Sequence, residues 1–391
     1  MKKSIGVLAI LATLGIATAP FASVEVNAQT TAAPAAAQGA CTDDSKAAWY
    51  ADFTKFRVPE PAKAYDAGKK YLTACPTEEG QIPTYLKKWV AAYEKEARHL
   101  KLNDLFLGQK KYADALTLAK EILTTEPDYL PATIYLGYGG YVVAVTTKNE
   151  AGNAEAISYA KKAIQAIDSG KTLESWTPFK SKDDALGYLY YSVGYLQRTS
   201  NPTEALSSFI KAAQFESDIK KNAQTYALIA GVYEADYARQ STDYEAKYKG
   251  KDETPESKLA VANINQVVDR IVDALARAVS VAGTDANAQA SKTAWLGRLT
   301  ELYKFRKGSE AGLNEMIAGV MAKPLPPVPT PLTTLPDTPA ATAAPTTGSV
   351  NTGSSTTMPS NAAAPAATGT TTTNTAKTAA KPKTRNNHRR P

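Results

Sequence analysis

Apolar residues recur at the spacing of an α-helix along most of this chain. Between Ser45 and residue 322 they return every three or four positions, and no stretch alternates apolar and polar residues as a half-buried strand would. The range is rich in alanine, leucine, tyrosine, lysine and glutamate. The pattern predicts an all-α domain over residues 45–322, preceded by a flexible segment at 29–44.

A short motif recurs in this range and predicts repeated helix pairs. It begins with alanine, has a small or aromatic residue four positions later, and an apolar residue three positions after that. Such positions share one face of a helix, and small side chains there allow a second helix to approach closely. Pro76 and Pro127 follow two of the copies, where they would end the helix. The copies begin at Ala64, Ala115, Ala156, Ala205 and, in diverged form, Ala274.

The helix expected before each alanine motif carries a second pattern. Tyrosines follow both Leu136-Gly137 and Leu186-Gly187. A related spacing of aromatic and small apolar residues occurs at Tyr226, Ile229, Ala230 and Tyr233. Together the patterns resemble the tetratricopeptide repeat, whose helices read W-x2-L-G-x2-Y and A-x3-F-x2-A with a later proline. The resemblance covers most of residues 45–290 and implies an α-solenoid of stacked antiparallel helix pairs with a concave inner face.

The spacing of the repeats departs from the family. Successive alanine motifs begin 51, 41, 49 and 69 residues apart, whereas the family period is about 34 residues. We interpret residues 234–257 as an insertion in a linker between helices. After residue 290 the chain predicts two more helices, broken near Lys307-Gly308, which would cap the array.

The glycines and tyrosines of the two segments that begin at Leu136 and Leu186 predict a binding surface. Gly137 and Gly187 each lower helix propensity by about 1 kcal/mol relative to alanine, which is tolerable where a second helix comes close. The resemblance places the residue after each glycine, and the residue three further on, on the concave face. These residues are Tyr138, Tyr141, Tyr188 and Tyr191. Tyrosine offers a large contact area at low entropic cost, so we expect anchors for a peptide or glycan; packing between repeats is the alternative interpretation.

The N-terminal residues have the pattern of a secretory signal peptide. Two lysines precede an unbroken run of small and apolar residues at 5–19, and Val26 and Ala28 stand three and one residues before a cleavage point. The run is shorter than the roughly 20 residues that a membrane span requires. We therefore predict that residues 1–28 are removed and that the protein is exported, to the periplasm or the extracellular space of a bacterium, without spanning a membrane.

The chain contains two cysteines, Cys41 and Cys75. An even number in an exported protein predicts one disulfide bond, and two free buried thiols are the alternative. A bridge closing this loop would contribute about 3–4 kcal/mol through chain entropy.

The positive charge lies mainly in the C-terminal tail. The formal net charge is +7, and nearly all of it belongs to residues 323–391, so the body is close to neutral and predicts no nucleic-acid-binding surface. The tail is rich in proline, threonine and alanine and lacks aromatic residues, which predicts disorder. It is either a spacer or a tether to an anionic envelope polymer. The tether would use Lys377, Lys381, Lys383, Arg385, Arg389 and Arg390.

No arrangement of catalytic residues stands out. His388 lies in the tail, and His99 lies in an expected helix, where a surface or packing role is the simpler interpretation. The glycines of residues 137–142 lack the preceding strand and the Gly-Lys-Ser/Thr ending of a phosphate-binding loop. The acidic pair Asp183-Asp184 begins an expected helix and favours its dipole. We expect no metal and no cofactor.

These observations favour a non-enzymatic binding or scaffold protein of the bacterial cell envelope. Its partner would be a protein or peptide held on the concave face of the helical repeats. A structural envelope protein held by the basic tail is the second hypothesis. A helical glycan-active enzyme is the third, because paired carboxylates can be brought together by a fold.

Overall fold

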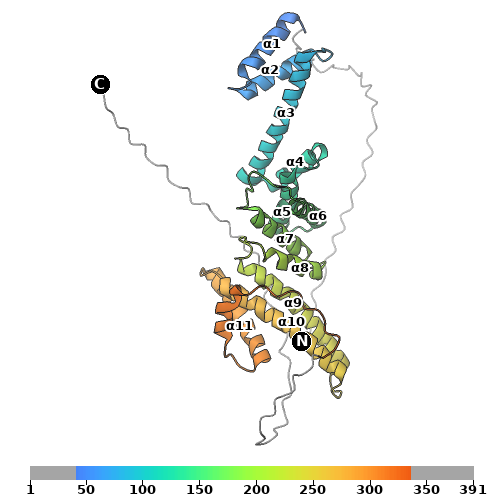
Figure 1. Cartoon of the computed structure of the whole chain (residues 1–391), viewed down its shortest axis with the longest axis vertical. Helices are drawn as coiled ribbons and strands as arrows, with labels where there is room; N and C mark the ends of the chain where they lie inside the picture. Colours follow the sequence, from blue (N-terminus) through green and yellow to red (C-terminus); the bar gives the residue numbers. More distant parts are fainter. Residues whose placement is uncertain (1–40, 336–391) are drawn as a thin grey trace, which may run out of the picture. The chain divides into compact units, whose positions relative to one another are not determined.

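The structure is a computed structural model that describes residues 41–335 (Figure 1). This range contains helices and no strand, so the predicted all-α class is confirmed. The described residues form two compact units, one ending at Lys95 and one beginning at Glu96. The boundary lies inside helix α3 (Gln81–Asn103). The predicted signal peptide at 1–28 and the six basic tail residues lie outside the described residues.

The N-terminal unit has a small core of its own. Helices α1 (Asp43–Phe56) and α2 (Pro61–Ala74) pack against each other, and the first part of α3 completes the unit. Phe53 is 1% exposed, and its ring lies edge-on to that of Trp89, with 5.0 Å between centroids. The buried residues of this core are Phe53, Ala64, Ala67, Tyr71, Cys75 and Leu86.

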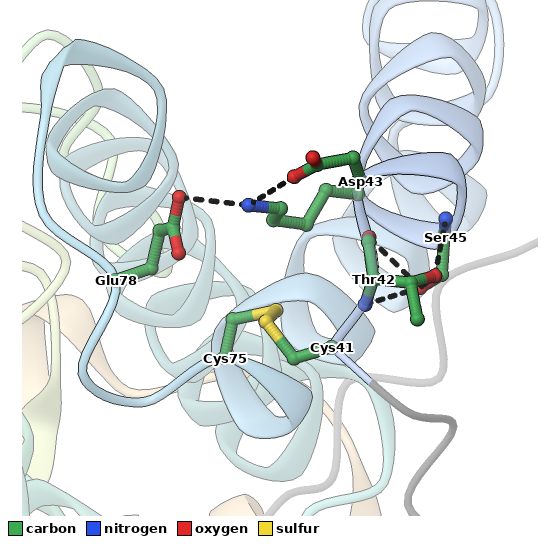
Figure 2. The surroundings of a disulfide bond; sticks show 7 residues. Cys41, Thr42, Asp43, Ser45, Cys75 and Glu78 are labelled. Carbon is green, nitrogen blue, oxygen red and sulfur yellow. Dashed lines mark hydrogen bonds and ion pairs between the residues drawn. A yellow bond between two sulfur atoms is a disulfide. The ribbon is translucent and has the colours of Figure 1, made fainter.

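A disulfide bond and an ion-pair bridge join the start of α1 to the end of α2 and the loop that follows it (Figure 2). Cys41 and Cys75 are bonded, with 5.4 Å between their Cα atoms, which confirms the predicted pairing. Beside the bridge, the Nζ atom of Lys46 lies 2.9 Å from Asp43 Oδ1 and 3.0 Å from Glu78 Oε1. The disulfide bond and the Lys46–Glu78 ion pair therefore join the same two parts of the chain, while the Lys46–Asp43 pair lies within α1.

Helix α1 begins inside the segment predicted to be flexible. The Thr42 side chain accepts a hydrogen bond from the Ser45 backbone N–H at 3.2 Å, and Ser45 Oγ accepts one from the Thr42 backbone N–H at 3.0 Å. This reciprocal cap satisfies donors that the first helical turn leaves without partners. The flexible segment predicted at 29–44 is thus ordered from Cys41, and the rest of it lies outside the described residues.

The larger unit is a succession of helices joined by short connections. After a π-turn at Asp104–Gly108 come α4 (Tyr112–Thr125), α5 (Leu130–Thr147), α6 (Asn153–Asp168), α7 (Lys182–Gln197), α8 (Pro202–Ala212), α9 (Ala223–Tyr248), α10 (Pro255–Val281), α11 (Ala286–Lys307), α12 (Leu313–Gly319) and a 3-10 turn at Val320–Ala322. From α4 to α11 each helix packs against the next one in sequence, and α5 also packs against α7 (Figure 1). This order of contacts is what stacked helix pairs predict.

The alanines that begin the repeat motif are all buried between helices. Each is at most 3% exposed: Ala64, Ala115, Ala156, Ala205 and Ala274. The predicted need for small residues is also met at Gly137, where an added Cβ would stand 2.7 Å from the Ala160 Cα atom. The periodic pattern therefore located the contact face of each second helix correctly.

Helix α9 is longer than the sequence pattern indicated. The range 234–257 was predicted to be an inserted linker, but α9 continues through it to Tyr248 and α10 begins at Pro255. Tyr233 and Tyr237 extend the buried face of α9 into this range, because residues four apart lie on one side of a helix. The linker prediction is wrong for the first fifteen residues of the range. The break predicted near Lys307-Gly308 is confirmed, since α11 ends at Lys307 and Gly308 has a φ of 77°.

The start of the predicted tail lies along α10. Residues 323–335 have no regular secondary structure, yet they are hydrogen-bonded to the side chains of Asn263, Arg270 and Arg277. The chain therefore stays on the helical body from the predicted boundary at residue 323 as far as Leu332. Residues 336–391 lie outside the described residues.

Candidate functional site

The structure brings the four predicted tyrosines together on α5 and α7. The ring centroids of Tyr138 and Tyr188 are 5.4 Å apart, and those of Tyr141 and Tyr191 are 5.8 Å apart. Both contacts are edge-to-face, the geometry that aromatic pairs favour. Tyr195, which sequence reasoning did not single out, adds a ring 5.3 Å from Tyr141. We call Tyr138, Tyr141, Tyr188, Tyr191 and Tyr195 the tyrosine cluster.

Helical spacing explains why these rings meet. Tyr138 and Tyr141 are three residues apart, so they lie on one side of α5. On α7 the same holds for Tyr188 and Tyr191, and Tyr195 follows one turn later. That last spacing is the signal in the sequence that would have revealed the fifth member.

The glycines of α5 and α7 lie against neighbouring helices. On α5, a Cβ at Gly140 would stand 2.5 Å from the Ala156 Cβ atom on α6. On α7, a Cβ at Gly194 would stand 2.8 Å from the Phe209 ring on α8. The partner helices therefore approach on the glycine sides of α5 and α7, while the tyrosine rings meet one another between these two helices.

The tyrosine cluster is only partly open to solvent. Tyr191 is 5% exposed, while the other four members are half-buried. The buried ring of Phe179 lies beneath, 5.3 Å from Tyr138 and 5.5 Å from Tyr188. The rings thus pack between successive helix pairs, and part of the surface of four of them is exposed to solvent.

Burial raises the pKa of four hydroxyls of the cluster, those of Tyr138, Tyr141, Tyr188 and Tyr191. It raises the pKa of Tyr188 to about 12, with the Asp184 carboxylate adding a smaller effect in the same direction. The pKa values of Tyr138, Tyr141 and Tyr191 are also raised, mainly by burial. At neutral pH these four hydroxyls are therefore uncharged, and each can donate and accept hydrogen bonds.

Two charged residues border the cluster. Asp184 is 3% exposed and accepts hydrogen bonds from the backbone N–H groups of Lys180 and Asp218, each at 3.0 Å. Asp183 and Asp184 do lie in the first turn of α7, where carboxylates favour the dipole, but the N-cap is Ser181, whose side chain accepts a hydrogen bond from the Asp184 backbone N–H. At the other end, the Arg198 guanidinium carbon lies 4.0 Å from the Tyr195 ring centroid, a cation–π contact.

Away from the cluster, a concave surface lies between α9, α10 and residues 323–335. It is a groove of about 410 Å³. Tyr244 and Tyr248 line its α9 side, Asn263 and Val267 line its α10 side, and Pro329 is among the lining residues of the extended segment. Sequence reasoning missed the groove because it assigned this half of α9 to a linker.

His99 has the packing role predicted for it. It is 9% exposed, and its ring stacks on that of Tyr129 with 3.9 Å between centroids. Its Nε2 atom lies 3.0 Å from Glu126 Oε2. The glycines of residues 137–142 lie within α5, so they form no phosphate-binding loop. His388 lies outside the described residues.

Residues 41–335 lack two features that would define other classes of site. No cluster of histidine, cysteine, aspartate and glutamate in this range is arranged to hold a metal ion. No helix there combines the length and apolar character of a membrane span.

The chain was also compared with known proteins. No family model matches it, no curated protein matches it, and no solved structure matches it.

Proposed function

We propose that this protein is an exported, non-enzymatic binding protein of the bacterial cell envelope that holds a peptide or a protein segment against the tyrosine cluster. The observation that carries the proposal is that tyrosines of α5 and α7, all half-buried except the buried Tyr191, meet at centroid distances of 5.3–5.8 Å. Rigid aromatic side chains with a polar edge are favoured as anchors in binding interfaces. The disulfide bond supports export, because such bonds persist in oxidising compartments.

The proposed partner lies along the positions that the tetratricopeptide resemblance assigns to an inner face. Neutral hydroxyls suit the amide groups of a peptide backbone, and the exposed ring surface suits apolar side chains. Phe179, below the rings, fixes their orientation, so the partner meets a surface that is already organised.

The proposal is tested by capture of a partner from envelope extract on the full mature chain. We expect Tyr138→Ala combined with Tyr188→Ala to lose the captured protein, while the same two positions changed to Phe keep the rings and most of the capture. The matched control is Tyr159→Ala, a half-buried tyrosine on α6 outside the cluster. Circular dichroism of each variant establishes that the helices are retained.

The tether hypothesis predicts a different result in the same assay. In a full-length variant, the six basic residues between Lys377 and Arg390 are changed to Gln. If this variant loses its partner while the tyrosine variants keep theirs, the tail carries the interaction and the proposed role of the cluster is refuted. If the tail variant captures as the native chain does, the tail is a spacer.

A further inference from the structure

The segment after the last helix crosses α10 in the opposite chain direction. We call residues 323–335 the strap. Asn263, near the start of α10, exchanges two hydrogen bonds with the backbone of Leu332, at 2.6 Å and 3.2 Å. Arg270, two turns later, donates to the Pro327 carbonyl at 2.9 Å. The order of the contacts along the two segments is therefore antiparallel.

The third contact is the most buried. Arg277, two turns beyond Arg270, is 3% exposed. Its guanidinium donates to the carbonyls of Lys323 at 3.1 Å and Pro324 at 2.9 Å. It is held in place by Asp273, whose Oδ1 atom accepts from Arg277 Nε at 2.7 Å. A guanidinium that is fixed in this way presents its remaining donors with little loss of entropy.

The three side chains on α10 are seven residues apart. Two helical turns separate each from the next, so all three lie on one face at intervals of about 10.5 Å. All five hydrogen bonds recorded between α10 and the strap use backbone atoms of the strap. This face of α10 therefore recognises an extended backbone and makes no polar contact with a strap side chain in the described structure.

Between residues 326 and 332 the burial of the strap follows a period of three, and Leu325 just before this stretch is half-buried as well. Pro326, Pro329 and Leu332 are half-buried, whereas the residues between them are exposed, among them Val328 at 42%. A polyproline II helix has three residues per turn, so one of its faces shows this spacing. Prolines restrict the unfolded segment, so less conformational entropy is lost when it becomes ordered. They have no backbone N–H, so a proline residue offers only its carbonyl for backbone hydrogen bonding.

The groove beside the strap has features of a proline-binding surface. Tyr244 and Tyr248 line it from α9, with 5.3 Å between their ring centroids, and Pro329 and Pro331 line it from the strap. Charged and polar residues of α9 complete its wall: Asp236, Arg239, Gln240, Asp243 and Lys247. Aromatic grooves are a recurrent means of binding extended proline-rich segments. The aromatic groove and the row of donors on α10 adjoin each other, since Asn263 belongs to both.

We propose that the α10 face bearing Asn263, Arg270 and Arg277 is a binding site for an extended proline-rich peptide, and that the strap occupies this site in cis. The ligand class is defined by the contacts: an extended segment, bound through its backbone, with proline or leucine at every third position of its central part. Because the strap is covalently attached, its effective concentration is high, on the order of millimolar. A peptide from another chain binds only where the strap has left.

The test uses the full mature chain and a labelled synthetic peptide with the sequence of residues 323–335. In an open-strap variant, the three docking residues of the strap are changed together: Pro326→Ser, Pro329→Ser and Leu332→Ser. We expect the peptide, followed by fluorescence anisotropy, to bind this variant at least about tenfold more tightly than the native chain. A peptide carrying the same three serines is the ligand control.

The location of the site is tested on the open-strap background. Asn263→Ala combined with Arg270→Ala should weaken peptide binding about tenfold or more, because bonds to three backbone atoms are lost. Lys258→Ala on the same helix, whose ion pair is with Glu253, should leave binding unchanged. Equal binding by the native and open-strap chains, no binding to a folded open-strap variant, or equal binding after the Asn263 and Arg270 changes would each overturn the proposal.

A measurement on the otherwise native chain covers the case in which the open-strap variant fails to fold. The Leu332 backbone N–H donates to Asn263, so hydrogen exchange of residues 325–335 should be slowed, and Asn263→Ala should remove this protection. Fast exchange of this segment in the native chain would show that the strap does not occupy the site.

Discussion

Gly137 on α5 lies directly against the backbone of Ala160 on α6. A Cβ at position 137 would stand 2.7 Å from both the N and the Cα atoms of Ala160. Side chains move aside easily, but here the obstacle is the main chain of a packed helix. The spacing between α5 and α6, and with it the direction in which the tyrosines of α5 point, depends on this missing methyl group.

Gly137→Ala is therefore expected to destabilise the larger unit. The added methyl group forces α5 and α6 apart, and overpacking of this kind costs about 1–3 kcal/mol. The matched control is Gly231→Ala in α9, where nothing lies within 4 Å of the added Cβ and where alanine should gain up to about 1 kcal/mol in helix propensity. Urea denaturation of both variants gives the comparison, and equal stability of the two would contradict the close approach.

Removal of the disulfide bond should weaken the N-terminal unit. The bond closes a loop between residues 34 apart in sequence, and chain entropy gives it about 3–4 kcal/mol. Hydrogen exchange in α1 and α2 of the double variant Cys41→Ser, Cys75→Ser should therefore be faster than in the oxidised native chain. The native chain treated with reductant should match the variant, and unchanged exchange in both would show that the ion pairs of Lys46 suffice.

Two fully buried tyrosines of α9 should respond differently to loss of the hydroxyl group. Tyr226 is 1% exposed and donates to the Lys220 carbonyl at 2.8 Å, so Tyr226→Phe should cost about 1 kcal/mol. Tyr237 is 2% exposed and its hydroxyl has no hydrogen-bond partner in the structure. Tyr237→Phe should therefore be neutral or stabilising. Thermal unfolding of the two variants decides the matter, and an equal loss of stability would contradict this difference in hydrogen bonding.

Alkaline pH should weaken the fold through the buried tyrosines. The pKa of Tyr188 rises from 10.0 to about 12 on folding, mainly through burial. Between these values the unfolded chain releases the proton while the folded chain keeps it, so stability is complete below pH 10 and falls as the pH rises toward about 12. Tyr188→Phe should make this fall less steep. The free energy of unfolding, measured at pH steps in that window, would contradict the assignment if native and variant chains followed parallel curves.

The sequence predicted the helical body well because its signal is local and periodic. Each motif alanine marks a face where helices touch, and all five are buried. The disulfide was also predictable, since the chain has only two cysteines. Gly137 was interpreted correctly because glycine lowers helix propensity, so its presence inside a helix indicates a close contact with another helix.

The errors concern features that depend on distant parts of the chain. Polar residues between positions 234 and 248 indicated a linker, but α9 gains its stability by packing on α10 through Tyr237, which no local pattern reveals. The strap was assigned to the tail because its composition offers little to bury. Its order comes from donors on Arg270 and Arg277, roughly fifty residues earlier in the chain.

For the tyrosine cluster, the sequence predicted which residues would meet and left their role undecided. Tyr138 and Tyr188 do meet, and their edge-to-face contact supports packing between repeats. Their half-buried surfaces leave room for a partner as well. Packing between repeats and binding of a partner require the same tyrosines in the same positions. They differ only in whether a ligand contacts the exposed part of the rings.

Position-resolved photo-crosslinking tests the central claim most directly. A benzophenone analogue of phenylalanine replaces Tyr141 at the cluster in one full-length sample and Tyr159 on α6 in another, and both are irradiated in envelope extract. The account predicts one defined protein or peptide crosslinked at Tyr141 and absent at Tyr159. The same adducts at both positions, or none at Tyr141 while the native chain still captures its partner, would show that the tyrosine cluster is packing alone.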